Sequence, residues 1–303
     1  MQLCSICNGG LKEWCTTPDW EYFTSEESYS YFQCIQCLSL FIQPVPSGKL
    51  SEIYPDHYYS FGKQSGNFVF QIKQWLDERY FSKLLKKITG QEVHVLDIGG
   101  GTGWLLGRMI PLDQRIKSTA IVDINAECRN IAEKNGHTFH LSRIEDFHST
   151  KKFDLILMLN VIEHVEDPAA VLLKVSSLLT DSGICLIKTP NVDSLDARLF
   201  RSTYWGGLHT PRHWTIYTAS GFIKQLAALP LSLKSLKYTQ GAPFWAYSIL
   251  VKLYGRKLWI KKNPLINHFL FTPISALFAV FDFIRAPFAP TSQMFVEIKK
   301  KSV

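Results

Sequence analysis

The sequence lacks the features that would direct it out of the cytoplasm. Its first residues, MQLCSICNGG, contain no basic stretch followed by an apolar segment, so nothing resembles a secretory signal and we expect a cytoplasmic protein. A C-terminal apolar run extends from Phe269 to Ile284 and is interrupted by Pro273 and Asp282. This run is shorter than the ~20 apolar residues that a membrane-spanning helix requires, so the sequence predicts no spanning segment.

Acidic side chains are scarce in the C-terminal third. From Arg198 to the end there are 15 lysines and arginines but only two acids, Asp282 and Glu297. The whole chain has 33 basic and 26 acidic residues and a formal net charge of +7, so the part before Arg198 is acidic. We expect the basic third to face an anionic partner: a phosphate-bearing substrate, a nucleic acid or lipid headgroups.

A glycine-rich turn follows the apolar strand predicted at Val93–Asp97, in the sequence VHVLDIGGGTGW. Glycines allow a sharp turn and a close approach of backbone N–H groups to a ligand at the start of the next helix. The third glycine or alanine of a dinucleotide fingerprint is missing, because Trp104 or Leu106 occupies that position. A phosphate-binding P-loop is also excluded, since no Gly-Lys-Ser/Thr follows.

The pattern Asp97-x-Gly99-x-Gly101-x-Gly103 instead resembles motif I of the class I S-adenosylmethionine-dependent methyltransferases. The resemblance implies that this turn passes beneath the methionine part of S-adenosylmethionine. It also implies that an acid at the end of the next strand binds the ribose hydroxyls, and Asp123, the last residue of TAIVD, is that acid.

The acid that would bind the adenine of the cofactor does not stand at the position usual in this family. Many members of this family hold the adenine amino group with an acid soon after the third strand, which we expect at Thr138–Leu141. Here Ser142 and Arg143 stand where the family often has Gly-Asp. Asp146, or Glu145, is the candidate replacement, the alternative being that either acid caps the following turn.

Strands and helices alternate with short connections, which predicts an α/β fold with a doubly wound, Rossmann-like parallel sheet. The resemblance implies seven strands, of which the last, Met294–Lys300, is antiparallel. Ligands of such sheets bind beyond the carboxyl ends of the strands. Those ends carry Gly99, Asp123, Asn160 and Asn191, and we assign Asn160 to the cofactor and Asn191 to the acceptor.

Four N-terminal cysteines form two pairs, Cys4-x-x-Cys7 and Cys34-x-x-Cys37, with 26 residues between the pairs. Thiolates paired in this way close a tetrahedral zinc site without another ligand. Disulfides or a redox pair would suit a secreted chain or a thioredoxin-like context, and neither is present. We therefore expect Zn²⁺ in a small module over residues 1–50 that provides structural support.

The segment NVIEHVEDP follows the strand predicted at Phe153–Leu159 and resembles the corresponding segment of the ubiquinone-type O-methyltransferases. The intrinsic pKa of histidine suits proton transfer near neutral pH, so His164 is a candidate base. In the alternatives, His164 caps or packs at the start of the next helix, or Glu163 and His164 hold a divalent metal. For a metal, the sequence shows no third ligand.

A second group of polar and aromatic residues, Tyr204–Tyr217, follows the fifth strand, which we expect at Ile184–Lys188, and contains Pro211, Arg212 and His213. It resembles a Gly-x-x-x-Pro-Arg-His segment that lies over the acceptor site in methyltransferases of bacterial sugar and surface-polysaccharide pathways. The resemblance implies base candidates His213 and His209 with Tyr217 as a hydrogen-bond partner, an anion clamp at Arg212 and an acceptor contact at Trp205. In the alternative, the Arg-His pair bonds to backbone carbonyls and fixes the loop.

Two further segments complete the domain organisation. Residues 51–90 form an aromatic loop and a linker helix. The loop is either a lid over the cofactor or substrate pocket, in which Tyr58 is a candidate acceptor contact, or a surface loop pinned by tyrosines. The methyltransferase domain then spans 91–303. Its long helical insertion, 241–290, is basic and aromatic, which fits a cover over the acceptor pocket, a homodimer face or a peripheral membrane contact through 245–288.

Together these features predict a zinc-containing, S-adenosylmethionine-dependent methyltransferase. Its expected acceptor is a hydroxyl of a sugar or another hydroxylated small molecule, carried on an anionic nucleotide or lipid, with C-methylation of a keto-sugar as a close variant. An RNA methyltransferase is a second hypothesis, but the cysteine module has one lysine against five acids between Cys4 and Cys37, which argues against nucleic acid. An inactive binding scaffold is a third, and the intact motif I argues against it.

Overall fold

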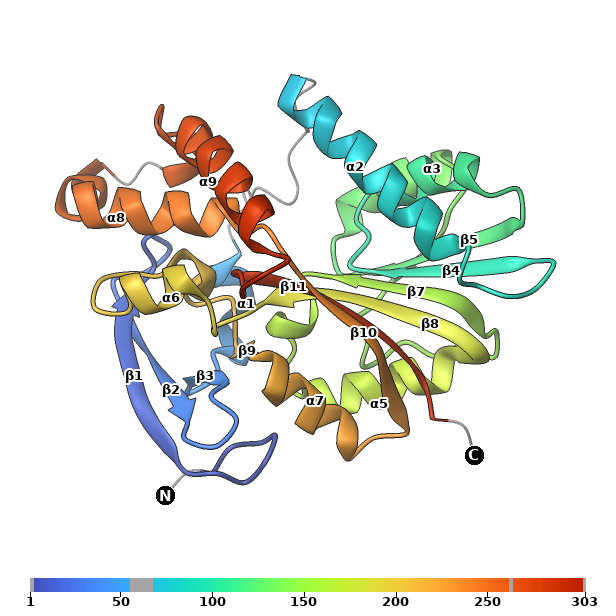
Figure 1. Cartoon of the computed structure of the whole chain (residues 1–303), viewed down its shortest axis with the longest axis horizontal. Coiled ribbons are helices and arrows are strands. Elements are labelled where there is room, and N and C mark those ends of the chain that lie inside the picture. The colour runs from blue at the N-terminus through green and yellow to red at the C-terminus, as the bar shows by residue number, and fades with distance from the viewer. Residues whose placement is uncertain (1–2, 55–67, 262–263, 302–303) are drawn as a thin grey trace.

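A seven-stranded sheet forms the centre of the computed structural model, which describes residues 3–54, 68–261 and 264–301 (Figure 1). The strand order is β10-β11-β8-β7-β4-β5-β6. These strands are β4 (Val93–Ile98), β5 (Ile116–Asp123), β6 (Thr138–Leu141), β7 (Phe153–Leu159), β8 (Leu179–Pro190), β10 (Leu231–Thr239) and β11 (Gln293–Lys300). Strands β4 to β8 are parallel, whereas β11 is antiparallel to β8 and β10. The predicted doubly wound fold with an antiparallel last strand is confirmed.

Helices cover both faces of this sheet, as parallel strands require. In β7, Ile156 and Met158 pack on one face and Leu155 and Leu157 on the other. The first face is covered by α5 (Pro168–Leu178) and α7 (Ala219–Ala227), the second by α2 (Phe68–Leu85), α3 (Trp104–Met109) and α4 (Arg129–Lys134). Because β4, β5, β7 and β8 are parallel, the segments that follow them meet at one edge of the sheet.

A second, antiparallel sheet joins the N-terminal segment to the Pro-Arg-His segment. It contains β1 (Leu11–Pro18), β2 (Ser28–Cys34), β3 (Leu40–Gln43) and β9 (Thr215–Ile216), in the order β1-β2-β3-β9. Strand β9 comes directly after the Pro-Arg-His residues, and its Ile216 lies opposite Leu40. The pairing of β3 with β9 therefore determines where the side chains of Arg212 and His213, just before β9, lie.

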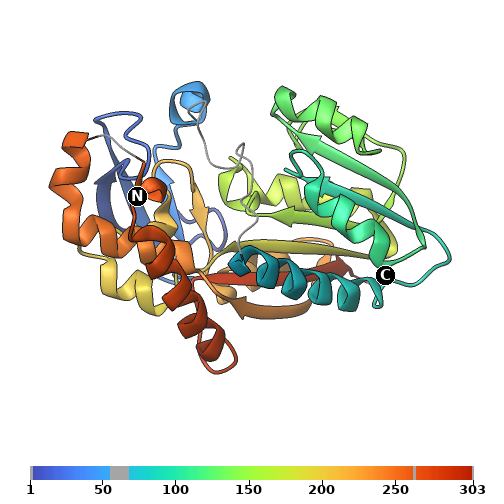
Figure 2. The ribbon, with the colours of Figure 1, turned by 90° about the horizontal axis from the view of Figure 1, so that it is seen from above.

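The insertion is a hairpin of two helices, α8 (Ala242–Lys261) and α9 (Phe271–Arg285), so its predicted helical character is confirmed. Trp245 stacks on Phe278 with ring centroids 4.3 Å apart. Side chains of α8 share one core with the N-terminal strands and the Pro-Arg-His segment, and Figure 2 shows these parts together at one end of the molecule. Within the part of the chain that the structure describes, neither helix, nor any other, has the length and apolarity needed to cross a membrane.

Candidate active site

The glycine turn after β4 has a backbone conformation that other residues rarely adopt. Gly99, Gly101 and Gly103 have φ angles of +73°, +53° and +75°. A Cβ atom on Gly99 would lie 2.6 Å from a side-chain carbon of Val161, and one on Gly103 would lie 2.2 Å from the ring of His137. The turn therefore needs glycine at these positions, because a side chain would strain the backbone at all three and would clash with Val161 or His137 at Gly99 and Gly103.

Two carboxylates flank this turn at the ends of β4 and β5. Asp123 accepts hydrogen bonds from the N–H groups of Gly101 and Asn125, both at 2.8 Å. Asp97 is only 4% exposed. Burial, reinforced by the nearby charge of Asp123, raises the pKa of Asp97 to about 8. An acid beside a tight glycine turn fits a ligand that carries a cationic group and vicinal hydroxyls, as S-adenosylmethionine does.

The remaining cofactor candidates lie on the same edge of the sheet. Asn160 follows β7 directly, is exposed and has a φ of +56°, and its N–H donates to the carbonyl of Lys188 at 2.8 Å. Asp146 is exposed in the turn after β6, where Arg143 pairs with Glu145 at 2.8 Å. Their contacts to a cofactor stay predictions.

Glu163 lies in a short 3₁₀ turn, η5 (Ile162–His164), directly after β7, and its side chain is fully buried. One carboxylate oxygen, Oε2, accepts a hydrogen bond from the hydroxyl of Thr189 at 3.0 Å. The other, Oε1, has no hydrogen-bond partner among the described residues. Burial raises the pKa of Glu163 to about 8.

His164 points toward the Pro-Arg-His segment and does not cap the next helix. The N-cap of α5 is Asp167, whose side chain accepts from the N–H of Ala170 at 3.0 Å. Nδ1 of His164 lies 2.9 Å from the carbonyl oxygen of Arg212 and 2.9 Å from the hydroxyl of Tyr54. Burial, with smaller contributions from His209 and Arg212, lowers the pKa of His164 to about 3, so the ring is neutral at pH 7.

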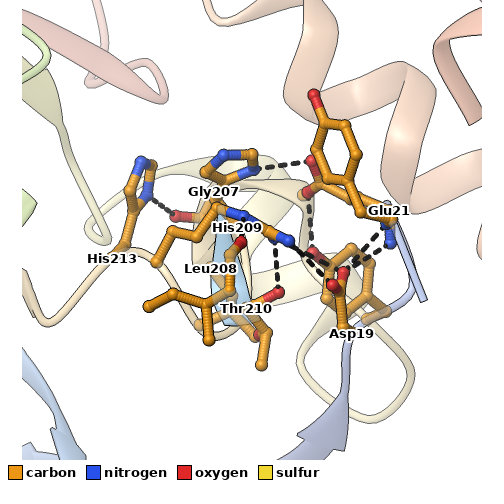
Figure 3. Close-up of polar contacts among 12 residues, drawn as sticks. Asp19, Glu21, Gly207, Leu208, His209, Thr210 and His213 are labelled. Atoms are coloured by element: carbon orange, nitrogen blue, oxygen red, sulfur yellow. Dashed lines mark hydrogen bonds and ion pairs between the residues drawn. The ribbon is translucent and has the colours of Figure 1, made fainter. Parts of the chain in front are cut away.

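His213 reaches the same place from the Pro-Arg-His segment. Its Nδ1 is 2.8 Å from the carbonyl oxygen of Gly207 (Figure 3). Its Nε2 is 3.9 Å from Oε1 of Glu163. The side chain is only 5% exposed, and burial lowers its pKa well below the usual value, with His164 and His209 adding to the effect. Two base candidates and a buried carboxylate thus form one cluster.

His209 lies next to His213 and is hydrogen-bonded to the N-terminal segment. Its Nδ1 is 2.6 Å from Oε2 of Glu21, and Oε1 of Glu21 accepts from the hydroxyl of Tyr204 at 2.7 Å (Figure 3). Its ring centroid is 5.0 Å from that of His213. The buried carboxylate fixes the orientation of the His209 ring and ties the loop to the N-terminal segment, and a role of His209 as a base stays a prediction.

Arg212 is fully buried and does not form an anion clamp. Its guanidinium pairs with Asp19 at 2.8 Å and donates to the carbonyls of Ile53, at 2.7 Å, and Thr210, at 3.0 Å. It also lies 4.6 Å from the ring centroid of Tyr22. These contacts correspond to the alternative in which the arginine fixes the loop. The sequence does not single out Asp19 as the partner of Arg212 or Glu21 as the partner of His209, although both acids stand in a conspicuously aromatic stretch.

Two predicted acceptor contacts are wrong, because their polar atoms are already used inside the protein. The indole N–H of fully buried Trp205 donates to Asp196 at 2.7 Å. The side-chain amide of fully buried Asn191 donates to the carbonyls of Thr291, at 2.8 Å, and Asp193, at 3.1 Å. Both residues hold the backbone beyond β8 in place.

Two tyrosines named from the sequence do not contribute to the described cluster. Tyr217 is fully buried, and its ring packs against Phe222 at a centroid distance of 4.8 Å. Burial raises the pKa of its hydroxyl, so it is a core residue and the interpretation as a catalytic partner is corrected. Tyr58 lies outside the described residues.

The four N-terminal cysteines converge as predicted. Sγ of Cys4 is 3.6 Å from Sγ of Cys37, Sγ of Cys7 is 3.5 Å from Sγ of Cys34, and all four sulfurs lie within 4.8 Å of one another. Bonds of ~2.3 Å from zinc to tetrahedral thiolates would place the sulfurs roughly 3.8 Å apart, so the residues fit the ion. The hydrogen bond between the Cys4 and Cys37 thiols lowers the pKa of Cys37 and raises the pKa of Cys4.

Replacing Cys34 with serine is expected to release this metal and to destabilise the protein. The cluster joins the start of β1 to the end of β2, and the carbonyl of Cys37 accepts from the hydroxyl of Thr218 just after β9, so its loss also loosens the end of the Pro-Arg-His segment. We expect zinc to fall from one to zero per chain by elemental analysis, and the melting temperature to fall by at least about 4 °C. Cys15→Ser, outside the cluster, is the matched control. Unchanged zinc content in Cys34→Ser would refute the four-cysteine site.

Residues 71–234, more than half of the chain, match the family described as a methyltransferase domain. The chain therefore belongs to this methyltransferase family. Its seven-stranded sheet and its glycine turn between two acids agree with that membership.

Curated relatives match over a limited stretch. The mitochondrial ubiquinone biosynthesis O-methyltransferase of Candida albicans is 30% identical over 131 residues, which is 40% of each chain. The ubiquinone biosynthesis O-methyltransferase of Glaesserella parasuis serovar 5 (strain SH0165) is 31% identical over 109 residues, 32% of this chain and 45% of that protein. The match thus spans less than half the length of either relative. Among solved structures, coclaurine N-methyltransferase bound to N-methylheliamine and S-adenosylhomocysteine shares the fold, with a TM-score of 0.51. It is 12% identical in sequence, and the alignment covers 79% of this chain and 76% of the coclaurine N-methyltransferase chain.

Proposed function

We propose that this chain transfers a methyl group from S-adenosylmethionine to a hydroxyl of a sugar or another hydroxylated small molecule. The observation that carries the proposal is the Glu163–His164–His213 cluster, which lies beyond β7 on the same edge of the sheet as the glycine turn. When bound, S-adenosylmethionine supplies an electrophilic methyl group. The chain must then align the acceptor oxygen with that methyl and take up the proton of the hydroxyl.

The hydrogen bonds of His213 support a role in removing that proton. A carbonyl oxygen only accepts, so the contact with Gly207 requires the ring proton on Nδ1. The lone pair is then on Nε2, the atom nearest to Glu163. A neutral histidine oriented in this way can accept a proton from a nearby hydroxyl, and C-methylation of a keto-sugar would use the same group to remove a carbon-bound proton.

The choice of a sugar-like acceptor rests on the whole set of segments in the chain. A four-cysteine module, motif I, the EHVEDP segment and the Pro-Arg-His segment occur in that order, as in the methyltransferases of bacterial sugar pathways. The contacts of Asp19 and Glu21 give the module a function in this scheme, because they hold the loop that carries His213. Zinc in the module is part of the same proposal.

The test of cofactor use is a calorimetric titration with S-adenosylhomocysteine on a pair of glycine variants. Gly101→Val places a branched residue where φ is +53°, so we expect the Kd to rise at least about tenfold, a loss of about 1.4 kcal/mol. Gly107→Ala adds a methyl group in α3, where a Cβ meets nothing within 4 Å, and should bind normally. No binding by the unaltered protein would contradict the proposal, and equal binding by Gly101→Val would refute the motif assignment.

A lipid-carried acceptor would account for the outer face of the insertion. The exposed apolar side chains of α9 and the residues after it form a stripe: Leu277, Val280, Phe283, Ile284 and Phe288. Lys252 and Lys257 of α8 are exposed, and Asp282, the sole acid between 241 and 290, is fully buried. A basic surface beside an apolar stripe suits the interface of an anionic membrane, so we propose a peripheral contact there.

Sedimentation with vesicles tests this contact. We expect the protein to sediment with vesicles of phosphatidylglycerol at low salt, and the double variant Leu277→Glu/Phe283→Glu to stay in solution, because it places charge in the stripe. Leu173→Glu changes an exposed leucine on α5, away from the insertion, and serves as the control. If the unaltered protein does not sediment with the vesicles and instead forms a dimer that the double variant disrupts, the stripe is a homodimer face.

A further inference from the structure

Three side chains close to the end of β7 place hydrogen-bond acceptor atoms near one another. A ring nitrogen of His164, a ring nitrogen of His213 and a carboxylate oxygen of Glu163 all lie within 4.8 Å of one another. Oε1 of Glu163 is fully buried and receives no hydrogen bond from the described residues. A buried carboxylate oxygen without a partner carries a large energetic penalty, so the position calls for a proton or a cation.

The two histidines are oriented as metal-binding histidines usually are. Nδ1 of His213 faces the carbonyl of Gly207, and Nδ1 of His164 faces the carbonyl of Arg212. Each carbonyl fixes the proton on Nδ1 and leaves the lone pair on Nε2. Ligating histidines commonly donate their other ring N–H to a backbone carbonyl, which fixes the tautomer and increases the basicity of the ligand.

We propose that Glu163, His164 and His213 bind one divalent cation. Two imidazoles and one carboxylate are the ligand set of several three-ligand sites, and they suit Zn²⁺, Fe²⁺, Mn²⁺ or Co²⁺ better than Ca²⁺, which takes oxygen ligands. Ligands bound at about 2.1 Å lie roughly 3 to 4 Å apart, and Nε2 of His213 is 3.9 Å from Oε1 of Glu163. His213 supplies the third ligand that is absent from the sequence around Glu163 and His164.

The cation deepens the proposed function, on which this step rests. Three protein ligands leave positions open, and the acceptor hydroxyl can occupy one of them. Coordination lowers the pKa of the hydroxyl, and its proton passes to solvent water. The resulting oxyanion forms the new O–CH₃ bond as the S–CH₃ bond breaks, which leaves a methyl ether and S-adenosylhomocysteine. In the cation-bound state His213 acts as a ligand, and water takes the proton.

This site differs chemically from the four-cysteine site, and the difference permits a clean assay. Soft thiolates select zinc, whereas imidazole and carboxylate also accept the harder Mn²⁺. Electron paramagnetic resonance of free Mn²⁺, measured during titration of the purified, zinc-replete full chain, therefore counts the His–His–Glu site alone. We expect one bound Mn²⁺ per chain.

Variants locate that ion. Glu163→Gln keeps an oxygen that can accept from Thr189 but removes the charge, and His213→Ala removes a ligand, so each should weaken Mn²⁺ binding at least about tenfold. His94→Gln changes a histidine bonded to Ser118 at the other end of the sheet and should bind Mn²⁺ normally. Melting curves without metal identify folded variants, and if His213→Ala unfolds, Glu163→Gln decides.

Two results would overturn the site: no Mn²⁺ binding by the unaltered protein at millimolar metal, or equal binding by a folded Glu163→Gln. Titration with S-adenosylhomocysteine separates this inference from the proposed function. Mn²⁺ binding without S-adenosylhomocysteine binding supports the site and contradicts the methyltransferase activity. S-adenosylhomocysteine binding, with methyl transfer that survives chelation, refutes the site and leaves the activity standing.

Discussion

Replacing His213 with alanine is expected to lower the rate of methyl transfer by about 10²- to 10⁴-fold, because the change removes either the group that takes the proton or, in the cation-bound state, a ligand of the ion that acidifies the hydroxyl. The same change should leave the Kd for S-adenosylhomocysteine within about twofold, because the described contacts of His213 are with Gly207, Glu163 and His164 and none of these residues belongs to the glycine turn. Single-turnover rates with a saturating hydroxylated acceptor measure the first effect, and calorimetry measures the second.

His94→Gln again supplies the control, because it removes a partly buried imidazole outside the cluster. A His213→Ala protein that binds the cofactor and retains full activity would contradict the assignment and leave His164 as the proton acceptor. A parallel loss of activity and cofactor affinity would show that His213 supports the cofactor pocket and not the transfer step.

Local features of the sequence were sufficient for the cofactor side of the site. The glycine turn, Asp97 and Asp123 follow from a strand, a turn and an acid at the end of the next strand, all within 30 residues. Strands β6 and β7 begin and end where the apolar runs TFHL and FDLILML do. Cysteine spacing located the thiolate cluster for the same reason, since two short knuckles determine most of its geometry.

The acceptor side depends on contacts between distant parts of the chain. Asp19 and Arg212 are 193 positions apart, and Glu21 and His209 are 188 apart. These pairs form because β3 aligns with β9, and no local pattern specifies that register. His213 approaches Glu163 by the same route, which is why the sequence around Glu163 showed no third metal ligand.

The misassigned residues share one physical cause. Trp205, Asn191 and Arg212 were interpreted as facing an acceptor because polar and aromatic side chains are dense around them. A buried loop also needs such side chains, since each buried N–H and C=O group requires a partner. Asp196 accepts a hydrogen bond from Trp205, and backbone carbonyls accept hydrogen bonds from Asn191 and Arg212. Composition alone does not reveal whether a polar group turns toward a ligand or toward the chain.

The ion pair between Asp19 and Arg212 leads to the largest expected change in stability. Asp19→Asn leaves the guanidinium buried without its counter-charge, and breaking a buried pair in this way typically costs about 3–5 kcal/mol in the free energy of unfolding. The asparagine oxygen can still accept from the N–H groups of Glu21 and Tyr22, whereas its NH₂ group faces donors of Thr24 and Arg212, so the loss includes these hydrogen bonds as well as the charge. Urea unfolding measures it. Glu27→Gln, which breaks the exposed pair with Lys49 in the same segment, should not measurably change the midpoint.

A double-mutant cycle and a pH series distinguish the ion pair from a general packing defect. Asp19→Asn with Arg212→Met should cost less than the sum of the single changes, since the double variant has no unpaired buried charge. Burial alone would raise the pKa of Asp19, but the charge and hydrogen bonds of Arg212 outweigh burial and lower it below 3.8. The pair's contribution is therefore fully present above about pH 4 and declines as the pH falls further. Additive losses, or an Asp19→Asn penalty unchanged at pH 3, would show that Arg212 is stabilised mainly by the carbonyls of Ile53 and Thr210 and by the ring of Tyr22.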